Sequence, residues 1–198
     1  TKTHPAGDIL PLAALGQREI GENRVQEIME KLPDIGEKFD IHLIGRLQSN
    51  KVKYIIDKVA MIQSVDRLSL AQEIDRQGQK HGVQAKVLVQ VSPAGEEQKG
   101  GMPPEDVRAF LEEVRQMPGL RVKGLMAVMP NTTDTAYLEG LFRDMRALFD
   151  QLREENIPGV DMAELSMGMS GDYLLAAKYG ATMVRLGSAL FGPRNYNI

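Results

Sequence analysis

The sequence predicts a single β/α barrel domain over residues 1–198. Seven times, a helix-like segment is followed by a short apolar segment rich in β-branched residues, which is the alternation of a parallel sheet. The repeat is about 25 residues long, as in an eight-stranded β/α barrel. Open doubly wound sheets have fewer strands and a glycine-rich first turn. We therefore expect seven visible strands and an eighth that ends near Lys2, so the first strand lies largely upstream of Thr1.

The expected elements alternate along the whole chain. Helices are expected over residues 5–15, 22–32, 48–58, 68–80, 103–117 and 171–179, and strands over residues 19–21, 41–45, 61–65, 86–91, 122–129, 164–167 and 183–187. The longest helix carries an apolar stripe from Leu138 to Leu152, typical of a helix that faces a sheet. Thr132, Thr133 and Asp134 offer N-caps for it.

Composition excludes several classes of protein. The 24 basic and 27 acidic residues are mixed along the chain and give a net charge of -3, so no basic surface for nucleic acid is expected. The chain has no cysteine, which excludes disulfides and thiol nucleophiles. No apolar run is long enough to span a membrane. We expect a cytoplasmic protein with further residues upstream of Thr1.

Polar residues follow the predicted strands, at the end of a barrel where active sites form. Such strand ends are also where polar loops begin, so the set carries more weight than its members. The set comprises residues 2–3, 22–24, 46, 48–51, 66–67, 92, 166–170 and 187–188.

Two of these segments are suited to a phosphate group. Residues 166–171, Ser-Met-Gly-Met-Ser-Gly, lie between a strand and a helix, and their small side chains let backbone N–H groups approach an anion. Residues 185–188 follow the last strand, where many barrels complete a phosphate site. The alternative is that these glycines and serines are ordinary caps.

Lys2 is the lysine that we place at the end of a barrel strand, pointing inward. Desolvation there would free its amine to attack an aldehyde. A lysine at this position is otherwise most simply a solvated surface residue.

Six blocks of sequence, in order and spread over nearly the whole chain, resemble the YggS/PROSC family of pyridoxal phosphate homeostasis proteins. The blocks are GENRVQE at 21–27, HLIGRLQSNK at 42–51, GEEQKGG at 95–101, GLM at 124–126, LSMGMS at 165–170 and VRLGSALFG at 184–192. The resemblance implies the fold of the N-terminal barrel of alanine racemase. It also implies a protein that binds, buffers and delivers pyridoxal 5'-phosphate (PLP) without strong catalysis.

The same resemblance implies residue roles. Lys2, in Thr1-Lys2-Thr3, matches the lysine that holds the PLP aldehyde as an internal imine, and Arg185 matches the residue at the pyridine nitrogen. Ser170, Gly187 and Ser188 match the phosphate contacts, and Ser166 and Asn23 are secondary contacts. The family continues Lys-Pro where this chain has His4-Pro5, and we expect His4 to be solvated. A guanidinium beside the ring nitrogen disfavours its protonation, which makes the ring a weak electron sink.

Two enzyme classes are the alternatives. A PLP-dependent racemase or lyase would need a second base, for which Tyr173, Tyr179 and Tyr196 are poor candidates because nothing aims them at the cofactor. Alanine-racemase-like enzymes take that base from an additional domain and a partner subunit, so we expect a monomer.

A sugar-phosphate enzyme would need a pair of acid and base groups, and Glu22, Asp66 and Asp172 form no persuasive pair. His42 is expected to pack within a strand, and no spacing suggests a metal site. We interpret residues 96–99 as a charged surface turn rather than a lid. The lysines 51, 53 and 58 are expected to form a solvated face, with docking of client apoenzymes as the alternative.

Overall fold

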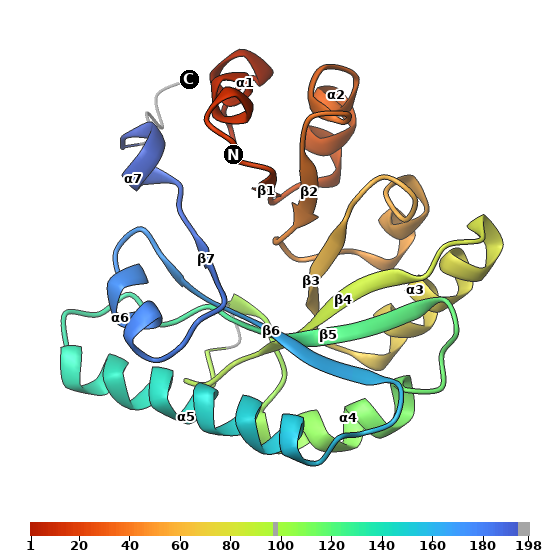
Figure 1. Cartoon of the computed structure of the whole chain (residues 1–198). Coiled ribbons are helices and arrows are strands. Elements are labelled where there is room, and N and C mark those ends of the chain that lie inside the picture. The colour runs from red at the N-terminus through yellow and green to blue at the C-terminus, as the bar shows by residue number, and fades with distance from the viewer. Residues whose placement is uncertain (97–98, 194–198) are drawn as a thin grey trace.

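The computed structural model describes residues 1–96 and 99–193. Its seven strands pair in parallel in the order of the sequence, which curves the sheet into a nearly closed barrel (Figure 1). The strands are β1 (Glu19–Glu22), β2 (Asp40–Leu43), β3 (Met61–Val65), β4 (Ala85–Val91), β5 (Leu120–Ala127), β6 (Val160–Met169) and β7 (Met183–Arg185). The fold prediction is confirmed.

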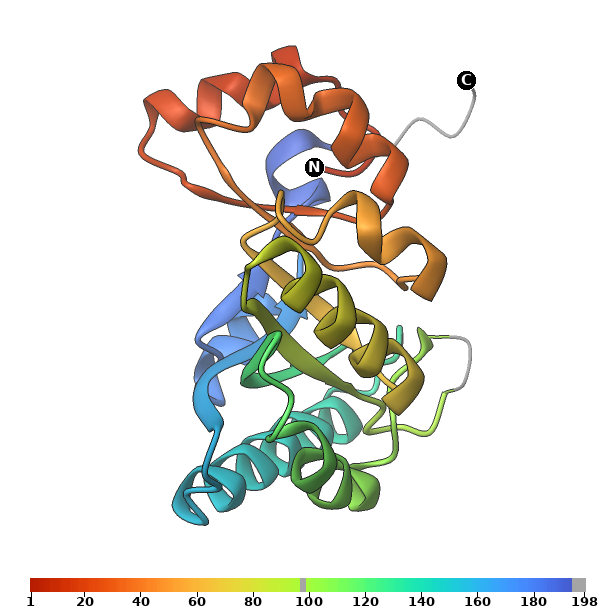
Figure 2. The same ribbon diagram turned by 90° about the vertical axis from the view of Figure 1, so that its right-hand side faces the viewer.

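Helices follow the strands and cover the outside of the sheet. They are α1 (Ala6–Ala14), α2 (Val25–Ile35), α3 (Leu68–His81), α4 (Val107–Val114), α5 (Thr135–Glu154), α6 (Tyr173–Lys178) and α7 (Ser188–Phe191), with 3-10 segments η1 (Ser49–Tyr54) and η3 (Pro104–Asp106). Figure 2 shows α1 and α2 on one side of the molecule and α4 and α5 on the other, with the strands between them. Asp134 caps α5, because its carboxylate accepts a hydrogen bond from the amide of Tyr137.

The central strands β3, β4 and β5 are buried along most of their length on both faces, so they are rich in apolar residues. Met61, Leu88 and Met126 form a small cluster that is separate from the main core. Residues two apart share a strand face, so Gln63 lies on the face of Met61 and turns into the barrel. The interior therefore contains polar as well as apolar side chains.

The segment predicted as a helix over residues 48–58 is a 3-10 helix, η1. Its backbone bonds join residues three apart, such as Lys51 to Gln48 and Ile55 to Val52. Val52, Ile55 and Ile56 are β-branched and therefore weak α-helix formers, and all three are buried. Burial of this apolar edge, rather than helix propensity, sets the local structure.

The loop after β4 is joined to the end of β5. Lys99 donates a hydrogen bond to the carbonyl of Met129 and forms an ion pair with Glu96. The other residues of the predicted turn, Glu97 and Gln98, lie outside the described residues, as does Tyr196. Within the described chain, no helix is both long and apolar enough to cross a membrane.

Candidate functional site

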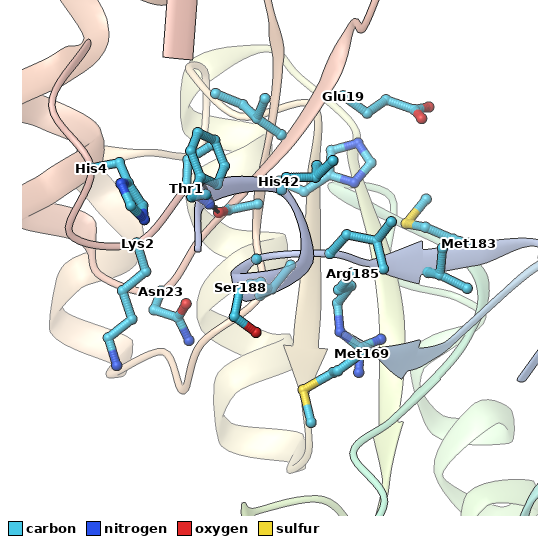
Figure 3. Close-up of a pocket in the computed structure, with 18 of the residues that line it drawn as sticks. Thr1, Lys2, His4, Glu19, Asn23, His42, Met169, Met183, Arg185 and Ser188 are labelled. Carbon is cyan, nitrogen blue, oxygen red and sulfur yellow. Dashed lines mark hydrogen bonds between the residues drawn. The ribbon is translucent and has the colours of Figure 1, made fainter. Parts of the chain in front are cut away.

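A cavity of about 460 Å³ lies where β1 and β7 face each other. Its walls come mainly from two segments that are far apart in the sequence, residues 1–23 and residues 183–192. Five of the seven predicted site residues line it: Lys2, Asn23, Arg185, Gly187 and Ser188. Figure 3 shows Lys2 and Asn23 on the side formed by the N-terminal segments, and Arg185 and Ser188 on the side formed by β7 and α7.

Lys2 lies in a turn before α1 and not at the end of a strand, which corrects the predicted local structure. The neighbouring Thr1 nevertheless contacts the sheet, because its backbone nitrogen donates to the carbonyl of Gly21 in β1 at 2.8 Å. Lys2 is half-buried, and within residues 1–96 and 99–193 its amine has no hydrogen-bond or ion-pair partner. The turn therefore presents an uncommitted primary amine at the cavity.

Arg185 is held in one orientation by two hydrogen bonds. One guanidinium nitrogen donates to Ser166 Oγ at 2.7 Å and the other donates to the carbonyl of Ala127 at 2.7 Å. Burial lowers the pKa of Arg185 to about 10, and nearby Asp172 opposes this shift. The side chain thus stays a cation at neutral pH. Ser166 does not line the cavity, and its role is to accept the hydrogen bond that holds Arg185.

The hydrogen bonds continue from Ser166 into the barrel. Ser166 donates to Gln63 Oε1 at 2.7 Å, and Gln63 Nε2 lies 2.9 Å from His42 Nδ1 and 2.9 Å from Met183 Sδ. Burial lowers the pKa of His42, although the carboxylates of Glu19, Asp40 and Glu164 oppose the shift. His42 is packed within its strand as expected, and it also lines the cavity.

Ser170 organises the loop between β7 and α7. Its hydroxyl accepts hydrogen bonds from the amides of Gly187 at 3.0 Å and Ala189 at 3.1 Å. These two N–H groups converge on one oxygen atom, which shows that the loop presents donors to an oxygen acceptor. Ser170 itself does not line the cavity, so its contribution is to hold Gly187 and Ser188 in place.

His4 is not solvated, which corrects the prediction. Its ring stacks on Phe191 of α7 with 4.3 Å between centroids and an interplanar angle of 22°, and only 22% of its side chain is exposed. Both residues line the cavity. The contact joins the turn that carries Lys2 to the helix that follows Ser188, and no local pattern in the sequence announces such a long-range pair.

The carboxylates considered for sugar-phosphate chemistry do not line the cavity. Glu22 pairs with Lys31, Asp66 pairs with Arg67, and Asp172 accepts from the amide of Met169. Among the described residues that line the cavity, Glu19 is the one carboxylate. Over the same described ranges, no group of three or more histidine, cysteine or acidic side chains could hold a metal ion.

Comparison with known proteins gives a consistent relationship. Residues 1–195 match the family of the alanine racemase N-terminal domain. The chain is 41% identical over 197 residues to a pyridoxal phosphate homeostasis protein from Aquifex aeolicus, with 99% of this chain and 86% of the relative covered. It is 38% identical over 200 residues to the protein of the same name from Haemophilus influenzae, covering 100% of this chain and 84% of that relative.

Solved structures agree. PipY of Synechococcus elongatus, solved without PLP, has a TM-score of 0.90 at 38% identity, with 96% of this chain and 89% of that chain covered. The same protein with PLP bound has a TM-score of 0.87 at 37% identity and the same coverage. An alanine racemase of Clostridium difficile has a TM-score of 0.79 at 20% identity, with 99% of this chain and 51% of that chain covered, and supports the fold alone. The chain therefore belongs to the alanine racemase N-terminal domain family, alongside the pyridoxal phosphate homeostasis proteins.

Proposed function

We propose that this protein binds PLP in the cavity between β1 and β7 and acts in PLP homeostasis, buffering the reactive aldehyde and delivering it to client apoenzymes. The observation that carries the proposal is that an uncommitted amine (Lys2), a fixed cation (Arg185) and the small residues Gly187 and Ser188 line one cavity. Relatives with the corresponding name and a PLP-bound structure of PipY support it.

The amine suits the reactive group of the cofactor. PLP supplies an aldehyde, which condenses with a primary amine and releases water. Lys2 is the lysine that lines the cavity among the described residues, and no carboxylate there engages it. We therefore assign the covalent contact to Lys2, with Asn23 beside it as a second contact.

The opposite wall suits the rest of the cofactor. The small residues Gly187 and Ser188 line this wall and would hold the phosphate. Ser170 would position them, because its hydroxyl accepts hydrogen bonds from the amides of Gly187 and Ala189. Arg185 would face the pyridine nitrogen, with Ser166 keeping its guanidinium in place. The donors match an anionic aromatic cofactor in both charge and hydrogen bonding.

A carrier without strong catalysis is the role that this chemistry favours. The fixed cation Arg185 disfavours a proton on the ring nitrogen and so limits carbanion stabilisation. Neither Tyr173 nor Tyr179 lines the cavity, and the Tyr179 hydroxyl contacts Glu139 on the outer surface. A racemase or lyase would reveal itself by exchange of the Cα proton of L-alanine in heavy water above the rate with free PLP, and we expect none.

Visible absorbance tests the binding site. The purified protein incubated with PLP should develop a band that free PLP lacks, and Lys2→Ala should abolish it because the covalent contact needs this amine. Lys38→Ala, an exposed lysine before β2, is the matched control and should keep the band. A colourless wild-type protein, or a band that survives Lys2→Ala, would overturn the assignment.

Delivery needs a separate measurement. PLP-loaded protein is mixed with a PLP-dependent apoenzyme in the presence of an excess of a small-amine trap that consumes free PLP. Recovery of enzyme activity under the trap would support direct transfer. Recovery that the trap abolishes would restrict the role to buffering.

A further inference from the structure

We propose that Glu27 and Lys31 are positioning residues for Lys2, a role that rests on the proposed function because it concerns the same amine. Neither residue lines the cavity, and both belong to α2. Together with Glu22 they hold the backbone on both sides of Lys2 and leave the Lys2 amine without an ionic partner.

We call Glu22, Glu27 and Lys31 the brace. Its first half holds Thr1, the residue before Lys2. Glu22 is completely buried, and its Oε1 accepts hydrogen bonds from Thr1 Oγ1 at 2.5 Å and from Lys31 Nζ at 2.8 Å. Lys31 also donates to the carbonyl of Thr1 at 3.1 Å. A buried carboxylate needs such a cation, so the pair fixes Thr1 as part of satisfying its own charge.

The second half of the brace lies after Lys2. Glu27 Oε2 accepts a hydrogen bond from the amide of Thr3 at 2.8 Å and lies 3.3 Å from Lys31 Nζ. Thr3 has φ = 68°, a left-handed conformation that is uncommon for a β-branched residue. Such a conformation persists only when its surroundings impose it, and the Glu27 contact is on the amide of this residue.

The brace also distinguishes two lysines. The Lys31 amine is buried and engaged by two carboxylates and a carbonyl, so it is not available to an aldehyde. Lys2 has no such partner in the described chain. The arrangement therefore directs an aldehyde to Lys2 and away from Lys31, although the Lys31 amine bonds the carbonyl of Thr1, the residue before Lys2.

The test compares two probes for the same cavity. PLP needs both the pocket and a correctly placed Lys2, whereas pyridoxine 5'-phosphate has an alcohol in place of the aldehyde and needs the pocket alone. Affinities for both are measured for the wild type, Glu27→Ala, Glu27→Gln and Glu30→Ala. Glu30 is an exposed residue on the same helix with no ion pair among the described contacts, so Glu30→Ala is the matched control.

We expect Glu27→Ala to weaken PLP by about tenfold, the effect of losing one hydrogen bond to a charged group, with the affinity for pyridoxine 5'-phosphate unchanged. Glu27→Gln keeps an acceptor oxygen for the Thr3 amide and should recover most of the PLP affinity. Borohydride reduction and peptide mapping should find the label on Lys2 in the wild type and a larger share on other lysines in Glu27→Ala.

Each result decides between the alternatives. Equal losses for both probes, or no loss for PLP, would overturn the positioning role. If Glu27→Ala does not fold, the same comparison is made with Lys31→Met, which removes the contact to the Thr1 carbonyl. Failure of the wild type to bond PLP at Lys2 would instead overturn the proposed function, so the two failures are distinct.

Discussion

At the scale of single residues, the fixed orientation of Arg185 is the feature with the clearest consequence. Its two terminal nitrogens are committed to Ser166 and Ala127, so the guanidinium presents the same face to the cavity in every molecule. A lysine could carry the charge but could not reproduce both contacts, because its three N–H donors share one nitrogen, whereas Arg185 donates from two nitrogens in a planar group.

We therefore expect Arg185→Lys to weaken PLP binding by roughly ten- to a hundredfold, the range for losing hydrogen bonds that involve a charged group. Quenching of cofactor fluorescence during titration measures the Kd. Arg143→Lys is the control, since Arg143 is exposed and pairs only with Asp144 in the described structure. An unchanged Kd for Arg185→Lys would show that PLP binding does not need the two hydrogen bonds that hold the guanidinium.

His42 gives a prediction about pH. Burial lowers its pKa below the ordinary value of 6.5, so the unfolded chain binds this proton more readily than the folded chain. The contribution to stability is complete above about pH 6.5 and is lost as the pH falls through the lower pKa of the folded state.

The melting temperature should therefore fall between about pH 8 and about pH 5 by more in the wild type than in His42→Gln, in which this titration is absent. The carboxylates of both proteins titrate alike, so the difference isolates His42. Identical slopes for wild type and His42→Gln would contradict the assignment.

Five of the seven residues named from the sequence line the cavity, and the other two, Ser166 and Ser170, bond to residues that line it. Lys2, Arg185 and Ser188 were named through the sequence blocks that resemble the family. Gln63 was missed because a buried glutamine has no motif of its own, although a polar residue inside the apolar strand Met61–Val65 is a signal that could have found it. Phe191 was missed because its partner His4 comes from the other end of the described chain.

At the scale of elements, the seven strands predicted between residues 19 and 187 are present, because most of them contain a run of buried apolar residues. The further strand predicted to end near Lys2 is a turn in the described chain. Helix type was harder to predict. The segment predicted as an α-helix forms the 3-10 helix η1, because burial of Val52 and Ile55 outweighs its helix propensity. The turn around Lys2 could not be predicted from the sequence, since its conformation depends on hydrogen bonds from Glu27 and Lys31 in α2.

The carboxyl end of β6 depends on one glycine. Gly168 has φ = 94°, and a Cβ atom there would collide with the side chain of Ala176 in α6. Gly168→Ala should destabilise the fold by about 1–3 kcal/mol and displace Ser170, which weakens binding of the phosphate group.

Thermal unfolding and a titration with pyridoxine 5'-phosphate measure both effects. Gly171→Ala lies in the turn just after β6, has no atom within 4 Å of the added Cβ and should behave as wild type. Equal behaviour of the two variants would show that the carboxyl end of β6 accommodates a side chain at position 168.

At the scale of the whole molecule, ligand binding should stabilise the fold, because the cavity joins β1 to β7 and exists only in the folded state. PLP at about one hundred times its Kd contributes about 2.7 kcal/mol. For a domain of this size that corresponds to a rise in melting temperature of about 5–11 °C.

Differential scanning fluorimetry measures this shift, with Lys2→Ala as the comparison. The variant keeps the phosphate and ring contacts and should show a smaller shift at the same PLP concentration. The same shift in both proteins would mean that the bond to Lys2 adds no affinity.

The stacking of His4 on Phe191 bears on how the protein is made. A ribosome releases Lys2 and Asn23 early and Arg185 and Ser188 late, and bringing such distant segments together carries a loop-closure cost. The two walls of the cavity meet only after residue 191 has left the exit tunnel. Capture of the aldehyde is thereby postponed until translation has passed β7, and a nascent chain stalled earlier would expose Lys2 without the partner wall that selects the ligand.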